Sequence, residues 1–141
     1  MIELANSLVA RSVLGKGLLS PLEIDPGHLD FKRVEGAENV KACIIDLITT
    51  RVGERLMNED IGTLLPDALF ENREGILDIL PIQLVEVITR FEPRVAQVQA
   101  IAKPFGETGV NVELSWVLRS TGRRENLVWP FYLNTTDGLA A

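Results

Sequence analysis

Hydrophobic residues along this chain follow a helical spacing in the middle of the sequence and an alternation of two in its last third. Apolar positions recur every three or four residues over about 37–50 and again over about 74–91, which predicts two amphipathic helices. Pro81 lies inside the second stretch and removes a backbone donor. The helix therefore starts near Pro81 or kinks there, and we favour a kink or a short preceding turn because Ile76 and Leu77 keep the period.

After Pro93 the period changes to two. Residues 110–118 alternate between the two faces of a predicted strand, and residues 95–102 and 127–133 give two further strands. Pro130 indicates that the last strand lies at a sheet edge. We therefore expect an α+β fold, with two main helices packed on a small antiparallel three-stranded sheet and an irregular N-terminal arm.

The other segments carry weaker patterns. Residues 2–14 have a weak helical pattern, and residues 18–35 contain prolines and glycine typical of an extended arm. The connection 51–66 is rich in turn residues, and we expect a short helical turn from Leu64 to Phe70. The predicted division is an N-terminal arm over 1–35, a folded domain over 36–134 and a flexible tail over 135–141.

Composition removes several classes of function. The net charge of −6 argues against nonspecific nucleic-acid binding, which needs a basic surface. No uninterrupted apolar run approaches the roughly 18 residues of a membrane span, so no membrane partner is expected. The single cysteine, Cys43, and the single histidine, His28, form no zinc-site spacing, and no metal or cofactor is expected.

Two short charged corners interrupt the apolar pattern: Gly53-Glu54-Arg55 and Glu92-Pro93-Arg94. The residue before a proline avoids helical conformation, so Glu92 should end the second helix. From an exposed position, Arg94 would then offer its five donors to a carboxylate or to carbonyls of a partner. The alternative is a local ion pair, Glu92 with Arg94 or Glu54 with Arg55, and for the first corner we favour that local pair.

Catalysis has little support in the sequence. Carboxylates in 54–74 could suggest a glycosidase, but they lie in a polar connection where solvated acids are common. Two long helices and three short strands leave little chain to build a sugar cleft. We therefore favour structural roles for these residues.

Several motifs occur in one order along the chain: the run Ile44 to Arg55, then Ile61-Gly62, Leu69-Phe70-Glu71, and the helix ending Phe91-Glu92-Pro93-Arg94-Val95. Over about residues 36–133 this order resembles the baseplate wedge family of contractile phage tails. That family also supplies the sheath-initiator subunit of tailocins, extracellular injection systems and type VI secretion.

The resemblance implies a non-enzymatic baseplate protein that joins the wedge to the sheath and nucleates sheath assembly. The resemblance implies that Glu92, Pro93 and Arg94 contact the wedge, and it assigns the same role to the turn of Gly53, Glu54 and Arg55. The implied partners are the sheath protein, other wedge proteins and the central spike or hub. Assembly would take place in the bacterial cytoplasm, within the baseplate of a phage virion or injection particle.

Two alternatives remain at this point. The family has carried a tail-lysozyme label, and a cell-wall-degrading tail lysozyme is the first. The tail-lysozyme spacing places an Asp nine residues after a Glu, whereas Thr63 stands nine residues after Glu54 here. The second alternative is a small adaptor that belongs to no injection machine.

Three strands in sequence order would leave open edges at 95–102 and 127–133. The last strand is apolar on both faces, with Trp129 and Phe131 on one face and Val128 and Tyr132 on the other. Together with the resemblance, this predicts that sheath arms add strands to the sheet, with Trp129 and Phe131 among the partner-binding residues. Pro130 would interrupt the added strand or shift it to the other edge.

Overall fold

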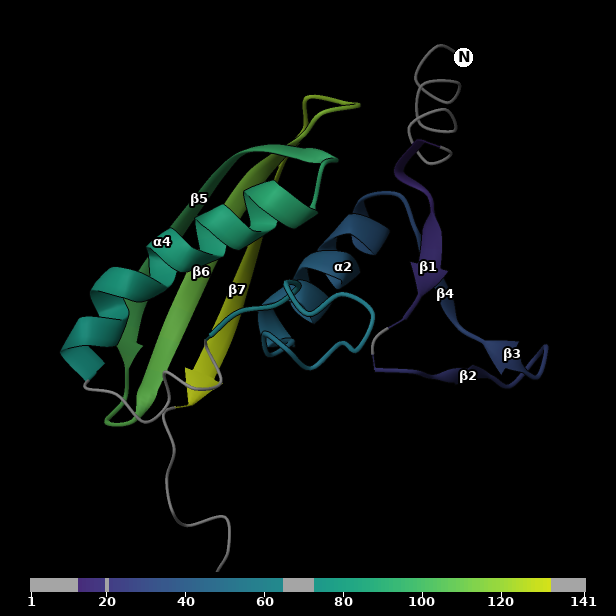
Figure 1. Cartoon of the computed structure of the whole chain (residues 1–141). Helices are drawn as coiled ribbons and strands as arrows, with labels where there is room; N and C mark the ends of the chain where they lie inside the picture. The colour runs from purple at the N-terminus through teal and green to yellow at the C-terminus, as the bar shows by residue number, and fades with distance from the viewer. Residues whose placement is uncertain (1–12, 20, 65–72, 133–141) are drawn as a thin grey trace, which may run out of the picture.

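The computed structural model describes residues 13–19, 21–64 and 73–132, and its main element is a three-stranded antiparallel sheet (Figure 1). Strands β5 (Val95–Phe105), β6 (Gly109–Leu118) and β7 (Arg124–Tyr132) follow one another in the order β5-β6-β7. The predicted strand order is confirmed. The outer strands are longer than predicted, since β5 continues to Phe105 and β7 begins at Arg124.

The strand register separates a buried face of the sheet from an open one. Val112 lies between Ala102 on β5 and Trp129 on β7, so these three side chains share one face. Along β6, this face carries the buried residues Val110, Val112, Leu114, Trp116 and Leu118. On the other face Glu113 lies between Ile101 and Val128, both of them exposed.

Helix α4 (Arg73–Phe91) covers the buried face of the sheet and lies mainly along β5 (Figure 1). It contributes four buried residues at helical spacing: Ile76, Leu80, Leu84 and Ile88. The helix is continuous through Pro81, so the expectation of a separate turn before Pro81 is wrong. Burial of the same face before and after the proline outweighs the loss of one donor.

Helix α2 (Ala37–Thr49) has a different position from the one expected. It buries Val40, Ile44, Leu47 and Ile48, and these join the common core. Its main neighbours, however, are α4 and the two strands β1 (Lys16–Leu18) and β4 (Arg33–Glu35). The expected arrangement of two helices packed side by side on one sheet is therefore corrected: α4 lies along the sheet, and α2 connects α4 with the N-terminal arm.

The N-terminal arm is regular where an irregular segment was expected. β1 pairs with β4, and β2 (Ile24–Asp25) pairs with β3 (Asp30–Phe31), which makes two small antiparallel sheets. An ion pair joins Lys32 and Glu23 across the strands at 2.6 Å. The arm extends away from the main sheet (Figure 1), and in its described part Leu14 is the apolar residue that reaches the core.

The connection after α2 forms a loop over 51–64 that closes on itself. The backbone N–H of Thr63 donates to the Thr50 carbonyl at 2.8 Å, and the N–H of Val52 donates to the Thr63 carbonyl. At the loop tip Leu56 and Met57 are almost fully exposed. Most of the predicted helix over 2–14, most of the turn from Leu64 to Phe70 and the tail over 135–141 lie outside the described residues.

Candidate docking site at the Glu-Pro-Arg corner

Residues of both charged corners, whose central residues are 39 positions apart in the sequence, line one hollow of about 330 Å³. Arg55 from loop 51–64 lines this hollow together with Glu92, Pro93 and Arg94. Helix α2 contributes Cys43, Asp46 and Leu47 to the same lining. The structure therefore brings Arg55 to the Glu-Pro-Arg corner, whereas Gly53 and Glu54 line a separate hollow together with Thr49, Arg51 and Val52.

Glu92 is buried, with 4% of its surface exposed, and its carboxylate is bonded to Arg94. The Nε of Arg94 donates to Oε1 of Glu92 at 2.6 Å, and a second guanidinium nitrogen donates to Oε2. These bonds raise the pKa of the Arg94 guanidinium above its usual range. Helix α4 ends at Phe91, one residue before Glu92. This position agrees with the expectation that the residue before Pro93 avoids helical conformation.

Arg94 also holds the base of the N-terminal arm. Its Nη1 donates to the Leu14 carbonyl at 2.7 Å, and Nδ2 of Asn39 donates to the same oxygen at 3.1 Å. Only 26% of the Arg94 side chain is exposed, so the expectation of an exposed guanidinium is wrong. Its donors bind the Glu92 carboxylate, which is the local pair that the sequence left open. They also bind the Leu14 carbonyl and so join the corner to the arm.

In the other corner, Glu54 does not pair with Arg55. Its Oε2 accepts a hydrogen bond from the backbone N–H of Arg51 at 3.1 Å, while Gly53 has a positive φ of 83°. The local pair favoured for this corner is therefore corrected to a side-chain-to-backbone bond. In the described part of the chain the Arg55 side chain has no hydrogen-bond or ion-pair partner, so its exposed guanidinium is the free cation of the hollow.

Trp129 and Phe131 lie on the buried face of β7 and are half-buried against the core. Trp129 is opposite Val112, and Phe131 is opposite Val110. The exposed apolar side chains of this strand are instead Val128 and Tyr132, on the open face of the sheet. A role for Trp129 and Phe131 in partner binding stays a prediction, and it would use only the exposed parts of their rings.

Sequence reasoning missed Leu14 and Asn39, which hold the arm against the corner. No local pattern could reveal them, because Leu14 and Arg94 are 80 positions apart. No cluster of three or more His, Cys, Asp or Glu residues that could hold a metal ion occurs within 13–19, 21–64 and 73–132. In these same ranges, none of the helices has the length and apolar character needed to cross a membrane.

A family model described as Baseplate wedge protein gp25 matches residues 34–123, which is more than half of the 141 residues. The chain belongs to the Baseplate wedge protein gp25 family. The matched range nearly coincides with the region of resemblance inferred from the motifs, so that interpretation is confirmed. It contains both charged corners, both helices and strands β5 and β6.

Among individual proteins, the Baseplate wedge protein gp25 of Enterobacteria phage T4 is 30% identical over 79 residues. The matched segment covers 52% of this chain and 60% of the phage protein, so this chain spans less than two thirds of that relative's length.

Two solved structures share the fold. A putative tail lysozyme from Geobacter sulfurreducens has 29% identity and a TM-score of 0.63, over 70% of this chain and 92% of that one. A chain of the anti-feeding prophage baseplate has 24% identity and a TM-score of 0.62, over 92% of this chain and 94% of that one. The second match supports the fold alone, and it extends over most of the present chain.

Proposed function

We propose that this chain is a structural, non-enzymatic baseplate component that joins the wedge to the sheath and starts sheath assembly. The machine is a phage tail, a tailocin, an extracellular injection system or a type VI secretion system, and assembly takes place in the bacterial cytoplasm. One observation carries the proposal. Within the described residues, β5 and β7 each pair only with β6, so both outer edges can accept another strand.

The direction of the backbone groups decides what each edge offers. The Leu118 N–H donates to the Arg123 carbonyl, so Leu118 faces β7, and the Arg119 N–H donates to the Arg94 carbonyl on the side of β5. Because backbone groups alternate in direction along a strand, the strand register identifies the residues that point outward. On β7 these are Arg124, Asn126, Val128, Pro130 and Tyr132, and on β5 they are Ala100, Ala102 and Pro104.

Both prolines occupy outward-facing positions. Pro130 therefore costs no bond in the β6-β7 ladder, which explains how it fits this strand, and it removes one donor from the free edge. Pro104 does the same on β5. The β5 edge is also broken by a bulge between Ala96 and Gln99, with a positive φ of 50° at Gln97.

These features favour β7 as the accepting edge. Arg124, Asn126 and Val128 present three outward residues in regular register before Pro130, whereas β5 has only Ala100 and Ala102 between its bulge and Pro104. We propose that a sheath strand pairs with β7 over 124–128 and ends before Pro130.

The test is Val128→Pro, which removes an outward donor without breaking a bond to β6. We expect a folded protein that enters baseplates but no longer starts sheath polymerisation. Ala102→Pro on β5 is the matched control and should leave polymerisation intact. Folding is measured by circular dichroism, and sheath length by electron microscopy. Normal sheaths on folded Val128→Pro baseplates would exclude strand addition at β7.

We also propose that the chain does not cleave peptidoglycan, although a solved structure with the same fold belongs to a putative tail lysozyme. Glu54, the candidate acid, is bonded to the Arg51 N–H, and Thr63 stands where the lysozyme spacing needs Asp. We expect no clearing in a zymogram with the purified chain. Clearing by the wild type that disappears in Glu54→Gln would contradict this expectation.

A further inference from the structure

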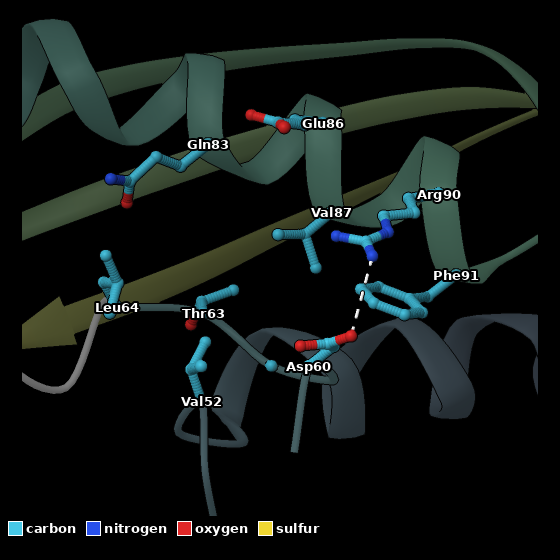
Figure 2. A pocket seen from close by; sticks show the side chains of 10 residues that line it. Val52, Asp60, Thr63, Leu64, Gln83, Glu86, Val87, Arg90 and Phe91 are labelled. Carbon is cyan, nitrogen blue, oxygen red and sulfur yellow. Dashed lines mark ion pairs between the residues drawn. The ribbon is translucent and has the colours of Figure 1, made fainter. Parts of the chain in front are cut away.

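A second hollow of about 330 Å³ lies between loop 51–64 and helix α4 (Figure 2). Val52, Thr63 and Leu64 line it from the loop, and Gln83, Glu86 and Val87 line it from the helix. Its lining is mainly apolar, with polar groups at the rim. Neither the sheet edges nor the two charged corners form part of this surface, except that Phe91 borders both hollows.

Helix α4 extends this surface with exposed apolar side chains. Ile82 is 69% exposed and Ile79 is 50% exposed. Gln83 and Glu86 lie three or four residues from these positions, so all four share one side of the helix. From Ile79 to Arg90 this side is roughly 16 Å long at 1.5 Å per residue. It forms a groove with an apolar strip along its wall.

The charges around the groove are mainly negative. Within the described residues the Glu86 carboxylate has no hydrogen-bond or ion-pair partner. Asp60 and Arg90 face each other at 3.8 Å, and both are largely exposed, so their interaction is weak (Figure 2). Of the charged residues that line the hollow, Asp60 and Glu86 are negative and Arg90 is positive. A partner with Lys or Arg would complement this surface.

The backbone around the groove is already bonded, which limits how a partner can bind. The N–H groups of Val52, Gly53 and Thr63 donate to carbonyls within residues 50–64, and α4 is a continuous helix whose interior N–H groups, apart from the one that Pro81 lacks, bond within the helix. An added strand would find no free ladder here, so recognition must use side chains. Apolar side chains at helical spacing, beside an apolar hollow, fit the helix-in-groove mode.

We propose that the groove between α4 and loop 51–64 receives an amphipathic helix of another baseplate protein. Apolar side chains of that helix cover Ile79 and Ile82 and enter the hollow, and a Lys or Arg of the same helix binds Glu86. The proposal rests on the proposed function only in taking the partner from the same particle. It concerns incorporation into the baseplate, whereas the β7 edge concerns the sheath, so each can fail without the other.

The first experiment places the photoreactive residue p-benzoylphenylalanine at position 82 of the full chain, in cells that assemble the particle. Ile101, exposed on the open face of the sheet, is the control position. We expect a cross-link from position 82 to a helical segment that carries Lys or Arg. A cross-link only to a second copy of this chain, a link to an extended strand, or a yield no higher than at position 101 would overturn the proposal.

The second experiment is Glu86→Lys, which sets like charges against each other across the groove. We expect incorporation into baseplates to fall on the order of tenfold. Glu74→Lys is the matched control, because exposed Glu74 is about 180° around the helix axis from Gln83 and roughly 18 Å along it from Glu86. Its incorporation should be unchanged, and both variants should keep the melting temperature of the wild type.

Replacing the Lys or Arg of the cross-linked partner helix with Glu should then restore the incorporation of Glu86→Lys. Normal incorporation of folded Glu86→Lys, or an equal loss in Glu74→Lys, would contradict a salt bridge at this groove. If Glu86→Lys does not fold, the cross-link from position 82 decides the proposal alone.

Discussion

Arg94→Ala is expected to lower the free energy of unfolding by about 3–5 kcal/mol, because it leaves a buried carboxylate without its partner. Glu92 has almost no exposed surface, and Arg94 supplies both of its side-chain partners. The same change removes a donor from the Leu14 carbonyl, which anchors the N-terminal arm. Denaturant unfolding of the purified chain measures the effect.

Arg55→Ala is the matched control, since Arg55 lines the same hollow but its side chain is exposed and has no partner in the described residues. Its stability should stay within about 0.5 kcal/mol of the wild type. A double change, Glu92→Leu with Arg94→Met, should recover much of the loss because it leaves no buried charge. If Arg94→Ala keeps wild-type stability yet fails to enter baseplates, Arg94 acts in docking and its bonds to Glu92 add little to the fold.

Gly62→Ala should destabilise loop 51–64 strongly, and with it the walls of both hollows. Gly62 has a φ of 129°, and a Cβ there would lie 2.6 Å from the Thr50 carbonyl oxygen and 2.8 Å from the Arg51 carbonyl carbon. Backbone strain of this kind costs roughly 1–3 kcal/mol, and the contact with backbone atoms adds to it. Thermal unfolding and limited proteolysis of the loop measure the change.

Two other glycines provide controls of increasing tolerance. Gly53 has a φ of 83° but open space around it, so Gly53→Ala should cost only about 1 kcal/mol from the left-handed backbone. Gly75 lies in open space within helix α4, where alanine should stabilise by up to about 1 kcal/mol. Equal effects at Gly62 and Gly53 would show that the loop moves to accept the Cβ.

The parts of the fold that bury one face were predictable from the sequence. The α4 stripe, including Leu84 and Ile88, and the alternation around Trp116 appear directly in the sequence, because burial imposes a period. The arm was not predictable, since its strands are two or three residues long and depend on pairs such as Lys32 with Glu23. Short polar strands carry no period that distinguishes them from a loop.

The candidate site divides in the same way. The position of the Glu-Pro-Arg corner at the helix end followed from Pro93 alone. The orientation of the Arg94 side chain depends on Leu14, which is distant in the sequence. The lack of a pair between Glu54 and Arg55 depends on the turn at Gly53. Local rules therefore placed the residues along the chain, whereas tertiary contacts determined which donors were already used.

The outward position of Pro130 has a consequence for the free subunit before it is incorporated. Two copies that met edge to edge along β7 would be related by two-fold symmetry, so each would bring its own proline into the shared ladder. The ladder between the two copies would then lack two donors. A shorter strand from a different protein, in contrast, can end before Pro130. The proline thus biases β7 against association with itself and leaves the edge available to a foreign strand.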